Sequence, residues 1–168
     1  MKNQKHARAN DAEKETILTR EGLRKLEEEL EHLKGIRRKE VAERIKLAKE
    51  FGDLAENAEY DDAKNEQAFI EGRILQIEQM LRSARVIDDA AVAGDVVSVG
   101  ATVRLKDVAA GGELTYTIVG SAEADPLADR ISNESPVGRA LLGRKKGETV
   151  TIHVPAGTLT YTILDIVR

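Results

Sequence analysis

The chain has 168 residues, of which 33% are charged and 3% aromatic, and its formal net charge is −4. Cysteine is absent, which excludes disulfides and zinc or iron–sulfur sites held by thiolates. No apolar run reaches the roughly 18 residues that a membrane span requires. Residues 1–16 are polar and lack the apolar segment of a signal peptide. We therefore expect a cytoplasmic protein with a flexible N-terminal tail, whose role the sequence leaves open.

The first part of the chain has the apolar spacing of a coiled coil. We expect a helix to begin near Thr19, a suitable N-cap, although Gly22 stands where a capping box would carry Glu. The apolar positions then step by three and four residues, as in a coiled-coil seam. This seam comprises Leu23, Leu26, Leu30 and Leu33 and, after an interval in which the pattern loosens, Val41, Ile45 and Ala48.

A second helix with the same periodicity follows. Its seam comprises Ile70, Ile74, Ile77, Leu81 and Ala84. Gly52 stands where a C′ glycine would end the first helix. Two seams of similar length joined by a few residues bury each other only by folding back antiparallel. We therefore predict an antiparallel coiled-coil hairpin over residues 17–88 with its tip at 52–60, and arms of about 45 Å at about 1.5 Å per residue.

After Ile87 the pattern changes to short alternating runs that are typical of strands. The expected strands are Val97–Leu105, Glu113–Val119, Thr149–Val154 and Leu159–Val167. Ser135, Pro136 and Gly143 mark a short helix, with Ser at the N-cap, Pro at the first position and Gly at the end. Residues 89–168 therefore predict a small α+β domain, and the whole chain belongs to the α+β class.

Charge is distributed unevenly along the hairpin. The basic residues of the first arm are Lys34, Arg37, Arg38, Lys39, Arg44, Lys46 and Lys49. The acidic residues that follow are Glu50, Asp53, Glu56, Glu59, Asp61, Asp62 and Glu66. Such runs are most often solvated helix faces. The alternative is a basic shank that leads into an acidic end.

Two carboxylates of the tip, Asp53 and Glu56, are the candidate chemical groups. One interpretation is helix capping, in which Asp53 accepts from a free backbone N–H and Glu56 reaches back. The other is a partial ligand set for Mg²⁺, which proteins usually hold with one or two carboxylates together with substrate phosphates. In that case another macromolecule would complete the set, as at a loosely held second ion of a two-metal phosphoryl-transfer site.

The tip lies within a longer pattern. Its parts are Phe51-Gly-Asp-Leu-Ala-Glu-Asn-Ala-Glu-Tyr60, Ala63-Lys64-x-Glu66-Gln67 and Glu71-Gly-Arg-Ile74. In these stretches the chain closely resembles the bacterial Gre transcript-cleavage factors. The resemblance continues through Ala84-Arg-Val-Ile-Asp88, Glu123-Ala-Asp125, Ser135-Pro136 and the strands to Ile166, so it covers about residues 17–168.

The resemblance implies a coiled coil followed by a domain similar to FK506-binding proteins, which docks on RNA polymerase. Gre factors enter the secondary channel of the polymerase and stimulate its own Mg²⁺-dependent hydrolysis of backtracked RNA. They are not enzymes alone, bind no cofactor of their own and share the catalytic Mg²⁺ of the polymerase. The implied partners are RNA polymerase, at its channel and rim, and the 3′ end of backtracked RNA. The resemblance also implies a monomer that does not contact a membrane. Ser135 and Pro136 lie where the family's globular domain docks, although they could equally form a plain helix start.

The resemblance also assigns roles at the tip. Carried over by position, Asp53 helps to bind the second Mg²⁺, and Glu56 positions or activates the attacking water. Leu54, Asn57 and Tyr60 shape the tip or contact the polymerase. For Tyr60, packing at the base of the hairpin is an equal alternative.

The basic shank supplies candidate RNA contacts. Arg37 and Arg44 are seven residues apart and share a helix face, as do Lys39 and Lys46. Either stripe could hold RNA phosphates by charge, and Arg38 belongs to the same basic segment. Alternatively, Arg37 covers the loosened seam with its aliphatic stem.

Three rival functions stay open. A Gre-like inhibitor would occupy the same channel without stimulating cleavage, but the intact Asp53 and Glu56 pair disfavours it. A prolyl isomerase or chaperone would need an aromatic-lined pocket, whereas Tyr116 and Tyr161 are the only aromatic residues after Phe69. A coiled-coil adaptor would carry no chemistry. Zinc-finger channel factors of the DksA type are excluded because cysteine is absent.

Overall fold

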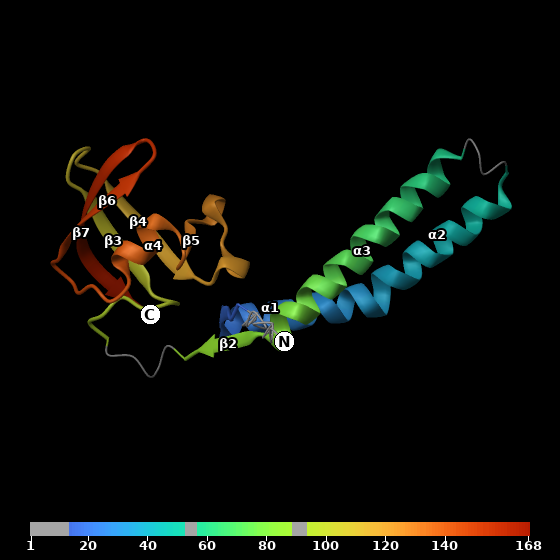
Figure 1. Ribbon diagram of the computed structural model, residues 1–168, viewed down its shortest axis with the longest axis horizontal. Helices are drawn as coiled ribbons and strands as arrows, with labels where there is room; N and C mark the ends of the chain where they lie inside the picture. Colours follow the sequence, from blue (N-terminus) through green and yellow to red (C-terminus); the bar gives the residue numbers. More distant parts are fainter. Residues whose placement is uncertain (1–13, 53–56, 89–93) are drawn as a thin grey trace, which may run out of the picture.

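A computed structural model describes residues 14–52, 57–88 and 94–168 of the chain. A long helical hairpin projects from a more compact domain that is rich in strands (Figure 1). The first half contains β1 (Thr16–Thr19), α1 (Arg20–His32), the π-helical turn η1 (Leu33–Arg37), α2 (Arg38–Glu50), α3 (Ala58–Arg82) and β2 (Ala84–Ile87). The predicted α+β class, with a hairpin followed by a small α+β domain, is confirmed. Most of the predicted tail and the tip residues Asp53, Leu54 and Glu56 lie outside the described residues.

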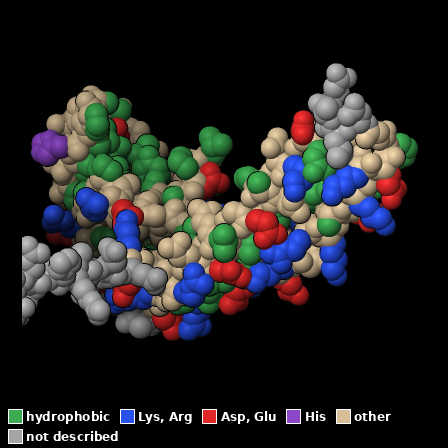
Figure 2. All heavy atoms as spheres, turned by 45° about the vertical axis from the view of Figure 1, so that its right-hand side comes forward, with side chains coloured by type: hydrophobic (Ala, Val, Ile, Leu, Met, Phe, Trp, Pro, Cys, Tyr) green, Lys and Arg blue, Asp and Glu red, His purple; other side chains and the backbone are tan. Residues whose placement is uncertain are grey.

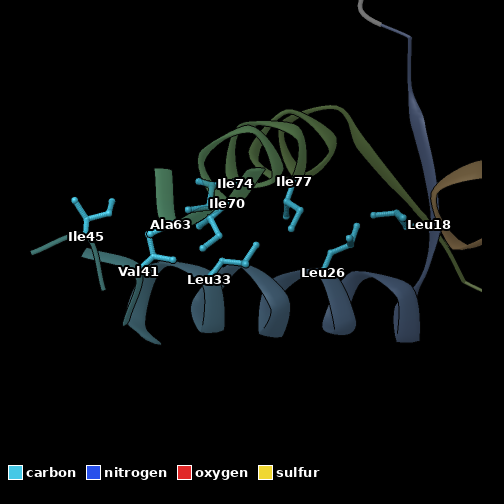
Figure 3. Packing of buried hydrophobic residues seen from close by; sticks show 9 residues of the cluster. All are labelled: Leu18, Leu26, Leu33, Val41, Ile45, Ala63, Ile70, Ile74 and Ile77. Atoms are coloured by element: carbon cyan, nitrogen blue, oxygen red, sulfur yellow. The ribbon is translucent and has the colours of Figure 1, made fainter. Parts of the chain in front are cut away.

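The hairpin core is a single row of aliphatic side chains between the two arms (Figure 3). Its buried members are Leu18, Leu26, Leu33, Val41, Ile45, Ala63, Ile70, Ile74 and Ile77. Leu23, Leu30 and Leu81 pack against this row and are partly buried. The predicted seam is therefore confirmed for both helices, and Ala84 also packs against the row, although from β2 and not from the helix.

The π-helical turn explains why the heptad pattern loosens. Leu26 and Leu33 are seven residues apart, and so are Val41 and Ala48, but Leu33 and Val41 are eight apart. The wider turn at Leu33–Arg37 accommodates the additional residue. As a result, the apolar positions on both sides of the turn face the same partner helix.

Local sequence sets the ends of the helices. Thr19 is the N-cap of α1, and its hydroxyl accepts a hydrogen bond from the Gly22 amide at 3.0 Å. Helix α2 ends at Glu50, and Gly52 has a φ of 150°, a backbone conformation that favours glycine. Both predictions are confirmed. Asn57, and not Asp53, is the N-cap of α3.

Two short strands close the base of the hairpin. β1 and β2 pair in parallel, with Thr16 opposite Ala84 and Thr19 opposite Ile87. The last position of the predicted second seam, Ala84, packs against the hairpin core but belongs to a strand, because the helix ends at Arg82. The hairpin thus starts from a braced base that contacts the C-terminal domain.

The C-terminal domain contains a five-stranded sheet with the order β5-β4-β3-β7-β6. Its elements are β3 (Thr102–Asp107), β4 (Glu113–Val119), the 3₁₀ turns η4 (Ser121–Glu123) and η5 (Pro126–Ala128), β5 (Arg130–Ser132), α4 (Pro136–Leu141), β6 (Thr149–Val154) and β7 (Gly157–Val167). The pairing is antiparallel except between β4 and β5, which are parallel. Helix α4 packs against the sheet through the buried Leu141.

One prediction for this domain needs correction, and one strand was missed. The strand expected at Val97–Leu105 begins only at Thr102, because Gly100 has a φ of 95° and turns the chain before it. The parallel strand β5 was not predicted, because three residues are too few for a periodic signal. Tyr161 is buried in the core and Tyr116 packs against it, so both tyrosines have structural positions.

Candidate functional site

The end of the hairpin lies at the far end of the molecule from the C-terminal domain (Figure 1). Helix α2 reaches Glu50 and α3 begins at Ala58, so residues 51–57 join the two arms. Asp53 and Glu56 belong to the four residues between Gly52 and Asn57 that lie outside the described residues. The described structure therefore determines where their segment begins and ends.

Asn57 ties the two arms together beside the tip. Its Nδ2 donates a hydrogen bond to the Ala48 carbonyl of α2 at 2.7 Å. Its Oδ1 accepts from the Tyr60 amide at 3.1 Å, which caps the start of α3. One side chain thus satisfies a free carbonyl near the end of α2 and a free amide of α3. This contact limits how far the two ends of the tip segment can separate.

Aromatic residues lie on both sides of the tip. Tyr60 is partly buried and packs against the hairpin core. Phe51 is one of the few aromatic residues of the chain, and 84% of its surface is exposed. It borders an open groove of about 380 Å³ that is also lined by Leu47, Asn57 and Glu59. We did not assign a role to Phe51 from the sequence, although an aromatic residue outside the seam was a usable signal.

A charge network crosses the shank just behind the tip. Arg44 on α2 donates to Glu59 on α3 from Nη2 at 2.7 Å and from Nε at 3.1 Å. Arg44 also pairs with Glu66, which in turn pairs with Arg37. The hydrogen bond to Glu59 raises the pKa of Arg44. Glu59, which the sequence grouped with the acidic tip, is therefore engaged by the shank.

Further pairs continue along the same two helices. Arg38 forms a bidentate contact with Glu71, at 2.7 Å from Nε to Oε1 and 2.8 Å from Nη2 to Oε2. This contact lowers the pKa of Glu71. Lys34 pairs with Glu78 and lowers the pKa of that carboxyl. Lys34, Arg38 and the predicted stripe of Arg37 and Arg44 are thus paired with carboxylates of the opposite arm.

Lys39, Lys46 and Lys49 differ from the arginines of the shank. All three are exposed, and within the described ranges none forms an ion pair with a carboxylate. On the face shown in Figure 2, positive and negative side chains are interspersed along the hairpin. Of the two predicted stripes, the one that carries Lys39 and Lys46 has charge available for an external anion.

Ser135 and Pro136 occupy the start of α4 in the C-terminal domain. The Ser135 hydroxyl accepts from the Gly138 amide at 3.0 Å and donates to the Ser132 carbonyl at 2.7 Å. Pro136 fills the first position of the helix. The start of α4 thus accounts for the presence of both residues, and their role in docking on RNA polymerase stays a prediction.

The part of the chain that the structure describes contains no group of three histidine, aspartate or glutamate residues able to hold a metal ion. In the same part, no helix has the length and apolar character needed to cross a membrane.

Comparisons with known proteins match nearly the whole chain. Residues 16–86 match a family model described as "Transcription elongation factor, N-terminal", and residues 92–168 match "Transcription elongation factor, GreA/GreB, C-term". A protein of Caldanaerobacter subterraneus subsp. tengcongensis named "Transcription elongation factor GreA" is 60% identical over 92% of this chain and 99% of its own. A protein of that name from Clostridium botulinum (strain Langeland) is 55% identical over 92% of this chain and 97% of its own. The protein in the crystal structure of GreA factor homolog 1 (Gfh1) of Thermus thermophilus is 30% identical in sequence. The match covers 92% of this chain and 100% of that chain, with a TM-score of 0.43.

Proposed function

Because this chain belongs to the GreA/GreB family of transcription elongation factors, we propose that it acts on RNA polymerase and stimulates cleavage of backtracked RNA. The hairpin enters the secondary channel of the polymerase tip first, while the C-terminal domain stays at the rim. The polymerase performs the hydrolysis, and the factor has no turnover alone. It works as a monomer in the cytoplasm, where it meets its partner.

The observation that carries this proposal is the continuous hairpin with its acidic connection at the far end. The apolar row keeps its phase through η1, so both arms stay in register up to the tip. Asn57 and the Arg44–Glu59 pair hold the last turns together. A braced projection of this kind can deliver a short segment into a narrow site on another macromolecule.

Asp53 and Glu56 supply the chemistry in this proposal. Their carboxylates are the hard oxygen donors that Mg²⁺ prefers, and two of them form only part of its coordination shell. Asp53 would help to hold the second catalytic Mg²⁺ of the polymerase, and Glu56 would position the attacking water. When bound, the ion stabilises the negative charge that develops on the phosphate.

The remaining contacts follow from position and free charge. Lys46, together with Lys39, would attract the phosphates of the extruded RNA 3′ segment. Arg37, Arg38 and Arg44 would do so only by exchanging their partners on α3 for phosphate. Reversal of the lysine charges should weaken activity, and the weakening should depend on salt concentration.

The tip and the C-terminal domain provide the proposed polymerase contacts. Leu54, Asn57 and Tyr60 shape the tip or touch the channel wall, and Phe51 adds an exposed aromatic face beside them. Ser135 and Pro136 mark the part of the C-terminal domain that docks at the rim.

The test is a cleavage assay on purified backtracked complexes with the variant Asp53→Asn, Glu56→Gln. We expect cleavage stimulation to fall on the order of 10–100-fold or more, as for altered metal shells, while binding to the polymerase persists. Asp62→Asn is the matched control, because Asp62 is an exposed carboxylate on α3 beyond the tip. Loss of binding in the double variant would mean that the tip mainly docks. Failure of the parent protein to shorten the RNA would favour a channel inhibitor.

A further inference from the structure

A carboxylate of the C-terminal domain lies at the first turn of α1. Glu123 in η4 accepts a hydrogen bond from the Thr19 amide at 2.8 Å through Oε2. It accepts a second from the Thr19 hydroxyl at 2.5 Å through Oε1. The Glu123 side chain is only 7% exposed, and Arg130 Nη2 lies 3.5 Å from its Oε1. This is a buried, charged contact between the two parts of the molecule.

The contact completes a capping box across the two domains. In a capping box, the N-cap side chain bonds the backbone N–H at N3, and a Glu at N3 reaches back to the N-cap N–H. Thr19 makes the first bond to the Gly22 amide. Glu123, 104 residues further along the chain, makes the second in place of a Glu at position 22. The start of the hairpin is therefore capped by the other domain.

Two glycines make room for this contact. Neither Gly22 nor Gly120 has a positive φ, so backbone conformation does not require glycine at either position. A Cβ on Gly22 would lie 2.1 Å from the Glu123 carboxyl carbon. A Cβ on Gly120 would lie 1.7 Å from the Ile17 carbonyl oxygen of β1. Both glycines are explained by the close approach of the domains.

We propose that Glu123 is a positioning residue that, with Gly22 and Gly120, fixes the direction of the hairpin relative to the C-terminal domain. The lever is long, because α1, η1 and α2 contain 13, 5 and 13 residues and extend about 45 Å at about 1.5 Å per residue. A rotation of about 10° at the joint would move the tip by roughly 8 Å over that length. The joint therefore determines where the tip lies when the C-terminal domain is docked.

The joint can be tested without the polymerase, because the chain has no native cysteine to interfere with labelling. Spin labels at Phe69→Cys on α3 and Val108→Cys beyond β3 would report the distance between the two parts by double electron–electron resonance. Both positions are exposed, at 72% and 54%. We expect one narrow distance distribution in the parent protein.

Variants of the joint should broaden that distribution. We expect Glu123→Ala and Gly22→Ala to widen it at least twofold, and Glu123→Gln, which keeps one acceptor oxygen, to widen it less. Glu113→Gln, an exposed carboxylate on β4, is the control that should leave it unchanged. Gly22→Ala keeps α1 helical because Ala favours helix more than Gly, so it carries the test if Glu123→Ala fails to fold. An unchanged width in folded Glu123→Ala or in Gly22→Ala would overturn the proposal.

The consequence for transcript cleavage rests on the proposed function and has its own signature. Only the correctly directed fraction of a loosened factor can bind productively, so its apparent affinity falls in proportion to that fraction. We expect Glu123→Ala to raise the factor concentration for half-maximal cleavage by about three- to tenfold, with the maximal rate nearly unchanged. A lower maximal rate without a wider distribution would contradict a positioning role. If the tip variants leave cleavage unaffected while Glu123→Ala still broadens the distribution, the proposed function fails and the joint stands.

Discussion

Among the described residues, the hairpin and the C-terminal domain each bury a cluster of nine aliphatic or aromatic side chains, but the two clusters are arranged differently. In the hairpin, the side chains form one row between two helices (Figure 3). In the C-terminal domain, strands β3, β4, β6 and β7 and helix α4 enclose the cluster. A single row has no second layer, so its burial depends on the phase of the two helices along their whole length.

The two regions also differ in their use of charge. Ion pairs join opposite arms of the hairpin repeatedly, from Arg73 and Glu29 through Arg38 and Glu71 to Arg44 and Glu59. In the C-terminal domain, the pair between Arg104 and Glu113 is exposed, whereas Arg130 pairs with the buried Glu123 at the joint with α1. The hairpin combines a narrow core with a charged flank, which makes it sensitive to register and to acid.

A change of register should produce the largest difference. Deleting Gly72 would rotate Ile74 and Ile77 by about 100° away from the seam, which should cost on the order of 4 kcal/mol or more. Deleting Gly35 should shift the melting temperature by only a few degrees, because it removes the residue that the π turn accommodates. Helical circular dichroism during thermal unfolding measures both effects.

The two deletions are matched, because beyond the backbone of its own helix turn no atom lies within 4 Å of where a Cβ would stand at either glycine. Equal damage from both would mean that phase does not govern hairpin stability. The near-ultraviolet signal of Tyr161, which is buried in the sheet domain, should report a folded C-terminal domain in both variants.

The tip should show a smaller effect. Asn57→Ala removes the cap of α3 and leaves the Ala48 carbonyl without its partner, so the hairpin should lose about 1 kcal/mol. Asn65→Ala, at an exposed position in the middle of α3, should cost nothing, because Ala favours helix more than Asn. Urea unfolding followed by helical circular dichroism compares the two. An Asn57→Ala variant with an unchanged free energy of unfolding would show that this side chain does not brace the tip.

Mild acid should produce the smallest and most graded difference. Hydrogen bonds from Arg73, Arg38 and Lys34 lower the pKa values of Glu29, Glu71 and Glu78 below the ordinary 4.5. A carboxyl whose pKa is lower in the folded than in the unfolded protein stabilises the folded state at pH values above the unfolded pKa. This contribution is lost as the pH falls through the pKa of the folded state.

Hairpin stability should therefore be level down to about pH 4.5 and decline below it, while the isolated pairs of the sheet contribute less. Thermal unfolding between neutral and acid pH, read by helical circular dichroism, measures this decline. A Glu29→Gln variant should show a shallower acid dependence than the parent. Identical slopes would exclude a contribution from the Arg73–Glu29 pair.

Periodic and local features were predictable from the sequence, and contacts between distant segments were not. The apolar spacing predicted the seam, Gly52 marked the end of α2, and Ser135 with Pro136 marked the start of α4. Each of these signals lies within one or two helical turns. The sequence also showed the one-residue irregularity before Val41, although not the turn that accommodates it.

The missed features depend on residues far apart in the chain. The pairing of β1 with β2 joins Thr16 to Ala84, and neither strand is long enough to show alternation. The carboxylate that caps Thr19 comes from Glu123. The absence of Glu at position 22 was visible in the sequence, but its replacement by another domain required the fold. The predicted roles of Asp53 and Glu56 rest on family resemblance and stay predictions.

The proposed role of the tip carboxylates can be tested by a Mg²⁺ titration of RNA cleavage in a purified backtracked complex, with and without the factor. We predict that the parent protein lowers the Mg²⁺ concentration for half-maximal cleavage, and that Asp53→Asn removes this shift while still binding the polymerase. The same Mg²⁺ dependence with and without the parent protein would show that the tip supplies no ligand to the ion.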